Sequence, residues 1–170
     1  ITSMTKAESE ELEAWFPGKC LVRTDRDAFD YVYAIDDLDD LRGRKLQKKR
    51  NHLHRFQAEH PEAVCVPLEA DNLEPAREMV ENWYRQRIAE DPHGEYLLEQ
   101  IAIHRAFRHF KALGMDGLML MDGGEVLAVT MGSRLSPDTI DVHFEKARED
   151  VDGAYAAINW EFARYLRAKY

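Results

Sequence analysis

The stretch from Thr139 to Phe162 constrains the fold of this chain most strongly, because it predicts a strand, a charged loop and an amphipathic helix in succession. Gly153 stands where the loop passes into the helix. A helix begins with backbone N–H groups that lack partners and with a partial positive charge, and glycine lets the chain come close to a ligand. A phosphate-bearing ligand is therefore one interpretation of this helix start, and an ordinary loop glycine is the other.

The strand predicted over residues 139–146 alternates in polarity. If it is regular, two sets of side chains occupy opposite faces, namely Ile140, Val142 and Phe144 on one and Asp141, His143 and Glu145 on the other. An imidazole and a carboxylate side by side can act as an acid/base pair. The alternative is a solvated face of an edge strand, which spacing alone favours.

Composition sets the outer bounds. The chain has 170 residues, of which 45% are hydrophobic and 32% charged, which is typical of a soluble globular protein with one full core and a small extension. There is no run of about 18 apolar residues and no signal-peptide pattern at the start, so the prediction is a cytoplasmic protein without a transmembrane segment. Cys20 and Cys65 are isolated cysteines on expected strands, which indicates buried reduced thiols and no metal site.

The distribution of charge is more informative than its sum. The net charge of −9 argues against indiscriminate nucleic-acid binding, DNA included. Residues 41–58 nevertheless contain no acid and seven fixed positive charges, and Lys45, Lys48, Lys49 and His52 share one face of an expected helix. This basic stripe either binds phosphate or is a solvated face that balances the acids of residues 36–40, and the pattern does not separate the two.

The order of expected elements indicates the fold class. Helices are expected over residues 5–15, 44–59, 71–89, 95–113 and 154–168, and strands over residues 20–23, 29–35, 64–68, 118–121, 125–132 and 139–146. Asp122-Gly123-Gly124 is the strongest hairpin signal in the chain. The sequence therefore predicts an α+β (mixed α/β) fold in which helices cover a central, mostly antiparallel sheet.

This order is similar to that of the GNAT acyltransferase fold, in which the pyrophosphate arm of the donor lies at the start of the helix after the fourth strand. In this chain that helix begins at Gly153. The usual GNAT signature, Q/R-x-x-G-x-G/A, is replaced by Asp150-Val151-Asp152-Gly153-Ala154-Tyr155, which argues against ordinary acetyl-CoA use.

A closer resemblance covers nearly everything from Phe29 to Phe162. The motifs KKRNH at Lys48 to His52 and GAYAAIN-x-EF at Gly153 to Phe162 lie about a hundred residues apart and are specific together; YVY at Tyr31 to Tyr33, L-x-G-x-K at Leu41 to Lys45 and H-x-E-K-A at His143 to Ala147 accompany them. With these motifs the chain resembles the uncharacterised bacterial family related to the C-terminal domain of phosphatidylglycerol lysyltransferase.

The resemblance implies a GNAT-like transferase that moves an aminoacyl group from aminoacyl-tRNA onto a lipid or peptidoglycan amine or hydroxyl. Because the donor is an activated ester, the protein need only orient the acceptor, accept its proton and hold the developing oxyanion. The implied catalytic residues are Glu145 as general base and His143 as its partner or an acceptor-orienting group. The implied donor contacts are Gly153 and the N–H groups of Ala154 and Tyr155. The implied phosphate or substrate contacts are Lys45, Lys49, Arg50, Asn51 and His52, with Asn159 and Glu161 as weaker candidates; a helix-to-sheet hydrogen bond is the alternative for Asn159.

The resemblance also implies tRNA as a partner of the basic helix, a lipid head group at a membrane surface as a possible acceptor, and no permanently bound cofactor. Family members usually begin with another GNAT-like half and end with a further strand. We therefore expect residues 1–60 to be the tail of a preceding half, residues 61–170 to be a transferase domain truncated at its C-terminus, the edge beside residues 139–146 to be exposed, and the isolated chain to have weak activity or none.

Two other classes of function are compatible with the sequence. An acyl-CoA-dependent N-acyltransferase would bind CoA saturably and resist salt, whereas an aminoacyl-tRNA user would lose affinity steeply as salt rises. A noncatalytic ligand- or protein-binding module would tolerate Glu145→Gln with unchanged ligand affinity.

Overall fold

The computed structural model describes residues 4–26, 29–94 and 96–170. The chain divides into two compact units, Ile1–Tyr33 and Ala34–Tyr170. The basic helix α3 (Gln47–Glu59) belongs to the larger unit, so this division falls before the boundary expected at residue 60. The origin of residues 1–60 in a preceding half stays a prediction.

The smaller unit contains the helix α1 (Lys6–Trp15). The Thr5 hydroxyl accepts from the Glu8 N–H at 3.2 Å and the Glu8 carboxylate accepts from the Thr5 N–H at 2.7 Å, which is a complete capping box. The helix expected over residues 5–15 is confirmed.

The two strands expected after α1 are wrong. The described residues of 20–34 form no strand, and Ile35 begins the short helix α2 (Ile35–Asp40). Leu21 and Tyr31 are 94% and 88% exposed, so this β-rich stretch has no sheet to pack against among the described residues. β-propensity acts through packing on neighbouring strands, and the pattern alone does not supply them. Part of the loop expected between these strands, residues 27 and 28, lies outside the described residues.

The larger unit is built on a four-stranded antiparallel sheet in the order β1-β2-β3-β4. Its strands are β1 (Val64–Pro67), β2 (Asp116–Asp122), β3 (Glu125–Ser136) and β4 (Thr139–Ala147). Gly123 and Gly124 turn β2 into β3 with φ of 56° and 86°, as the hairpin signal predicted. β4 is an edge strand of this sheet.

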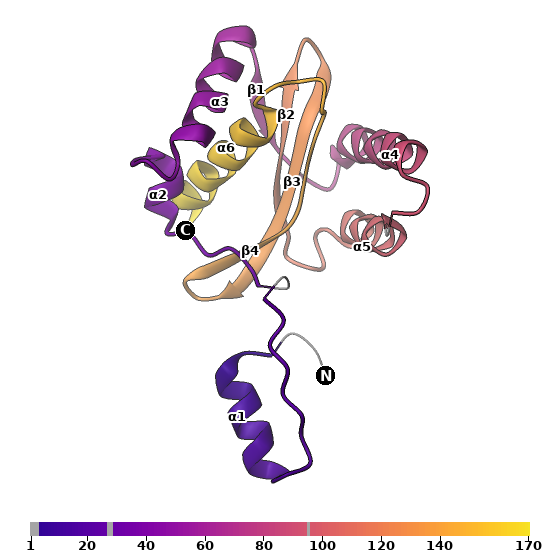
Figure 1. The fold of residues 1–170 in the computed structure, drawn as a ribbon. Helices are drawn as coiled ribbons and strands as arrows, with labels where there is room; N and C mark the ends of the chain where they lie inside the picture. The colour runs from indigo at the N-terminus through magenta and orange to yellow at the C-terminus, as the bar shows by residue number, and fades with distance from the viewer. Residues whose placement is uncertain (1–3, 27–28, 95) are drawn as a thin grey trace. The chain divides into compact units, whose positions relative to one another are not determined.

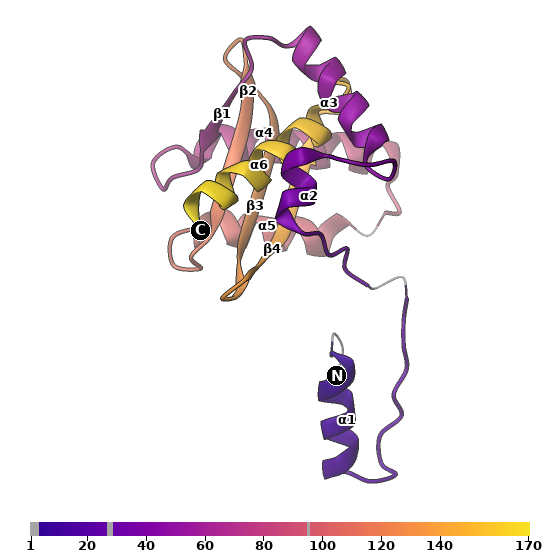
Figure 2. The ribbon, with the colours of Figure 1, turned by 90° about the vertical axis from the view of Figure 1, so that its left-hand side faces the viewer.

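Helices cover both faces of the sheet (Figure 1). One face carries α4 (Leu73–Glu90) and α5 (Tyr96–Arg108), while α6 (Ala154–Lys169) lies on the other. The helices α2 and α3 pack on the outer side of α6, as the view in Figure 2 also shows. The α+β prediction is confirmed. The expected first residue of α5, Glu95, lies outside the described residues.

The cap of α4 lies one residue later than expected. Asn72 rather than Asp71 precedes the helix, and the Asn72 amide accepts from the Glu69 N–H at 2.8 Å and donates to the Pro67 carbonyl at 2.9 Å. This amide ties the start of α4 to the end of β1.

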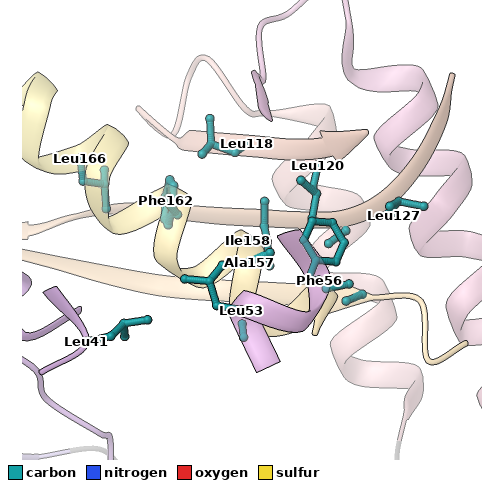
Figure 3. Packing of buried hydrophobic residues seen from close by; sticks show 14 residues of the cluster. Leu41, Leu53, Phe56, Leu118, Leu120, Leu127, Ala157, Ile158, Phe162 and Leu166 are labelled. Atoms are coloured by element: carbon teal, nitrogen blue, oxygen red, sulfur yellow. The ribbon is translucent and has the colours of Figure 1, made fainter. Parts of the chain in front are cut away.

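α6 packs against the sheet on one side and against α2 and α3 on the other, and this explains its alanine-rich sequence. Figure 3 shows Ile158 and Phe162 of α6 among Leu53 and Phe56 of α3 and the leucines of β2. Small side chains let α6 approach its neighbours closely; those that are buried are Ala154, Ala156, Ala157 and Ala163. A second hydrophobic cluster, between the sheet and α4 and α5, includes Val80, Tyr84, Phe107 and Met131.

The two cysteines are free and partly buried. Cys65 lies on β1 as expected, whereas Cys20 lies in the segment that forms no strand. Burial raises the pKa of the Cys65 thiol to about 12, and the charge of Glu161 adds to this effect.

Candidate functional site

Three polar side chains from separate elements meet between α3, α6 and β4. The Lys49 ammonium donates to the Asn159 Oδ1 at 2.7 Å, and the Asn159 Nδ2 donates to the Glu145 carboxylate at 3.1 Å. Lys49 and Asn159 are 110 residues apart in sequence, so only the packing of α3 on α6 brings them together. We call this group the Lys49–Asn159–Glu145 chain. It unites three residues that the sequence analysis named for site roles, and it contains the helix-to-sheet hydrogen bond weighed there for Asn159.

The surroundings shift the pKa values of both charged ends of this chain. Burial raises the pKa of the Glu145 carboxyl, while the hydrogen bond from Asn159 and the charge of Lys49 act in the opposite direction. Burial lowers the pKa of the Lys49 ammonium, and the charge of Glu145 partly offsets this. A carboxylate whose pKa lies above its ordinary value is a better proton acceptor near neutral pH.

Thr130 is a site residue that the sequence analysis missed. It pairs with Glu145 across β3 and β4, and directly paired residues of neighbouring strands place their side chains on the same face. Thr130 is fully buried, and its hydroxyl has no hydrogen-bond partner within the described part of the chain. Nothing in its sequence context marks it, because a threonine inside an apolar strand is ordinary.

His143 does not join Glu145, so the predicted pairing of these two side chains on one face is wrong. β4 gains one extra residue where the register shifts between Met131 and Gly132. As a result Ile140 packs with the α6 side of the sheet while Phe144 packs with the α4 and α5 side, and regular alternation is lost. The His143 ring instead contacts the Ser133 hydroxyl at 2.8 Å and the Asp141 carboxylate at 3.3 Å.

Gly153 serves close packing rather than close approach of a ligand. Its φ is +82°, and a Cβ there would collide with the carbonyl oxygen of His52 and lie 2.9 Å from the Cβ of Phe56. α3 therefore occupies the space that a side chain at position 153 would need. Ala154 is fully buried and its N–H donates to the Val151 carbonyl at 3.3 Å. Of the three expected donor contacts, only Tyr155 has an exposed side chain.

The basic stripe of α3 is divided between internal contacts and solvent. His52 and Arg55 both bind the Asp152 carboxylate in the loop before α6, His52 at 2.9 Å. Arg50 donates to the carbonyl of Leu41, a residue held in the left-handed conformation with φ of 48°. Arg50, His52 and Arg55 thus help to hold the outer helical layer in place.

The exposed basic and polar side chains of this region are fewer than the sequence suggested. The exposed basic side chains are Arg42, Arg44, Lys45, Lys48, His54 and Arg55, and the exposed amides are Gln47, Asn51 and Gln57. Lys45 and Asn51 are therefore accessible to a phosphate, as the sequence analysis expected of them.

Glu161 lies apart from this region, in a hollow of about 260 Å³ between α3, β1 and α6. Cys65, His60 and Trp160 also line the hollow. Burial raises the pKa of the Glu161 carboxyl, against the charge of Arg164 at 3.7 Å.

Residues 4–26, 29–94 and 96–170 contain no group of three or more His, Cys, Asp or Glu side chains placed to hold a metal ion. The helices of these described ranges include none with the length and apolar character needed to cross a membrane.

Comparison with known proteins gives the family. Residues 2–170 match the phosphatidylglycerol lysyltransferase C-terminal family, so the chain belongs to that family. A crystal structure of a conserved protein of unknown function from Bacteroides thetaiotaomicron VPI-5482 is similar, with 34% sequence identity and a TM-score of 0.88. The match covers 97% of this chain and 55% of that one, so this chain spans about half the length of that relative. No functionally curated protein matches. Family membership indicates a transferase-like function of the acyl or aminoacyl kind.

Proposed function

We propose that the larger unit is a GNAT-like transferase that moves an activated acyl or aminoacyl group onto an amine or hydroxyl acceptor. The observation that carries this proposal is the Glu145 carboxylate, whose pKa is raised by burial and whose position is fixed by Asn159. Membership of the phosphatidylglycerol lysyltransferase C-terminal family supports the same reaction class.

In this mechanism Glu145 is the general base. It accepts the proton from the acceptor O–H or N–H while the acceptor oxygen or nitrogen forms its bond to the carbonyl carbon of the donor ester. The donor alcohol leaves and takes up a proton, which Glu145 can return to it. The Asn159 amide holds the carboxylate in one orientation, and Lys49 lies beyond it in the same chain of hydrogen bonds.

Thr130 completes the site in this proposal. Its hydroxyl is beside Glu145 and keeps its donor and acceptor capacity for a substrate. A buried hydroxyl that lacks a partner costs free energy in the empty protein, and a substrate group that supplies the partner recovers it. We assign Thr130 the role of orienting the acceptor or stabilising the oxyanion.

The proposed donor is an aminoacyl-tRNA. The exposed Lys45, Lys48 and Asn51 supply phosphate contacts on the α3 side, next to Lys49 at the inner end. The net charge of −9 opposes binding of a polyanion over the whole surface and confines it to this patch. A lipid head group is the proposed acceptor class. Acyl-CoA is the less favoured donor, because α3 covers the start of α6 at Gly153, where a pyrophosphate would otherwise bind.

Transfer assays test this proposal directly. Labelled aminoacyl-tRNA is supplied with phosphatidylglycerol vesicles or small amines, with acyl-CoA donors in parallel, using this chain and any longer natural protein that contains it. Glu145→Gln is expected to lower the transfer rate by about 10² or more. Glu62→Gln, an exposed carboxylate on the loop before β1, is the matched control and should retain the rate. Affinity for charged tRNA should fall steeply as salt rises.

Other outcomes would point elsewhere. Transfer from acyl-CoA that resists salt would make the protein an acyl-CoA-dependent acyltransferase. Ligand binding that survives Glu145→Gln, together with no transfer from any donor in any natural context, would make it a binding module.

A further inference from the structure

Ser133, His143 and Asp141 form a second constellation. The Ser133 Oγ lies 2.8 Å from the His143 Nε2, and the His143 Nδ1 lies 3.3 Å from the Asp141 Oδ2. The serine contacts one ring nitrogen and the carboxylate contacts the other. This is the order of contacts that nucleophilic serine enzymes use, in which the imidazole takes the serine proton and the carboxylate orients the imidazole.

One tautomer of the His143 imidazole suits both neighbours. With the proton on Nδ1, the ring turns its N–H side toward the Asp141 carboxylate at 3.3 Å, and the Nε2 lone pair is left to accept from the Ser133 hydroxyl. The opposite tautomer would place a lone pair against the carboxylate. The carboxylate therefore selects the form of the imidazole that acts as a base toward serine.

The local fold explains how the three side chains meet. Ser133 and Asp141 are paired across β3 and β4, so their side chains share one face of the sheet. The extra residue in β4 brings His143 to them instead of to Glu145. Gly132 permits this geometry, because a Cβ there would lie 2.6 Å from the Asp141 carbonyl oxygen.

We propose that Ser133 is a nucleophile and that it is acylated by activated esters. The Ser133 Oγ attacks the ester carbonyl carbon and gives its proton to the His143 Nε2. The bond to the leaving alcohol then breaks, and the alcohol takes that proton, which leaves an ester on Ser133 and neutral His143. Water or an amine then attacks the ester by the reverse sequence, so the serine is regenerated and no further reactant is required.

Exposure defines the class of substrate. The side chains of His143 and Asp141 are 34% and 49% exposed, so the constellation is open to solvent and lacks the dry environment that amide hydrolysis demands. Esters with good leaving groups need less stabilisation of the oxyanion.

This inference is independent of the proposed transferase function. Ser133, His143 and Asp141 lie on β3 and β4 and contact one another. The Lys49–Asn159–Glu145 chain is a separate set of side chains, which joins α3, α6 and β4. Failure of either proposal leaves the other intact. Asp141 acts through His143, so it is a positioning residue here.

A fluorophosphonate probe tests the proposal, because it modifies serines that a neighbouring base activates. With the intact chain, mass spectrometry should find the adduct on Ser133. His143→Ala should slow labelling by about 10² or more. Asp141→Asn should slow it less, and Asp141→Glu should restore part of the rate, which a merely structural carboxylate would not do.

Ser136→Ala is the matched control. Ser136 lies at the end of the same strand, and its hydroxyl donates to Asp138 at 2.6 Å instead of contacting an imidazole. This variant should label at the wild-type rate, while Ser133→Ala should not label. Hydrolysis of p-nitrophenyl acetate should follow the same order among the variants, and circular dichroism checks that each is folded. No adduct on Ser133 in folded wild-type protein, or labelling that His143→Ala leaves unchanged, would overturn the proposal.

Discussion

The backbone carbonyl of His52 lies against the bare α-carbon of Gly153, so that a side chain at position 153 would collide with α3. Gly153→Ala is therefore expected to destabilise the protein by more than about 3 kcal/mol, since it adds a clash with backbone to the strain of a positive φ. The free energy of unfolding in urea measures this. Gly124→Ala isolates the strain, because Gly124 has φ of +86° and a Cβ at this position would meet nothing within 4 Å, and it should cost only about 1–2 kcal/mol. Equal costs for the two variants would contradict the packing role of Gly153.

Asn159 connects two charged side chains that are otherwise separated. Asn159→Ala removes one acceptor of Lys49 and a donor to Glu145, and we expect the free energy of unfolding to fall by about 1–3 kcal/mol. Asn82→Ala is the control, because Asn82 also lies on a helix but accepts only an exposed contact from Arg85; its effect should stay within about 0.5 kcal/mol. A double-mutant cycle of Lys49→Met and Glu145→Gln should show coupling between the two sites.

Glu145→Gln should stabilise the protein at neutral pH. Burial raises the folded-state pKa of Glu145 above its ordinary value of 4.5, so the folded protein binds this proton more tightly than the unfolded chain does. The stability that this preference contributes is present at pH values below 4.5 and is lost as pH rises through the folded-state pKa. The Tm difference between Glu145→Gln and wild type should therefore grow in favour of the variant from about pH 4 upward and then level off. A stability deficit of Glu145→Gln that is the same at all pH values would rule out this electrostatic account.

Cys65 should react slowly with thiol reagents. Raising its pKa from 9.0 to about 12 lowers the thiolate population at about pH 8 by about a thousandfold. In a Cys20→Ser background, iodoacetamide should modify Cys65 about 10³ times faster in denaturant than in buffer. Similar rates in both conditions would show that the thiol is not buried in solution.

The sequence predicted the elements of the larger unit well, because their signals are local. The hairpin at Gly123-Gly124 and the amphipathic helix after Gly153 both follow from side-chain spacing and turn chemistry. The strand expected over residues 29–35 did not form. A β-rich run specifies a strand only where a neighbouring strand is available, and composition does not report the neighbour.

The candidate site was only partly predictable, for two physical reasons. An extra residue in β4 changes which face His143 occupies, and such a bulge depends on the pairing with Gly132 rather than on the alternation of β4 itself. Lys49 and Asn159 each had a reason to be named, but their contact depends on helix packing across more than a hundred residues of sequence.

The position of α6 between the sheet and the outer helices has a consequence for synthesis on the ribosome. Leu41, which follows α2, and Leu53 and Phe56 of α3 are synthesised before the surface that covers them, which belongs to residues 154–169. Until that segment emerges, Leu41, Leu53 and Phe56 have no native partner on α6. The loop that must close to form this contact is about a hundred residues long. While α3 is complete and α6 is not, the growing chain therefore exposes an apolar surface, and apolar surface exposed in this way favours aggregation.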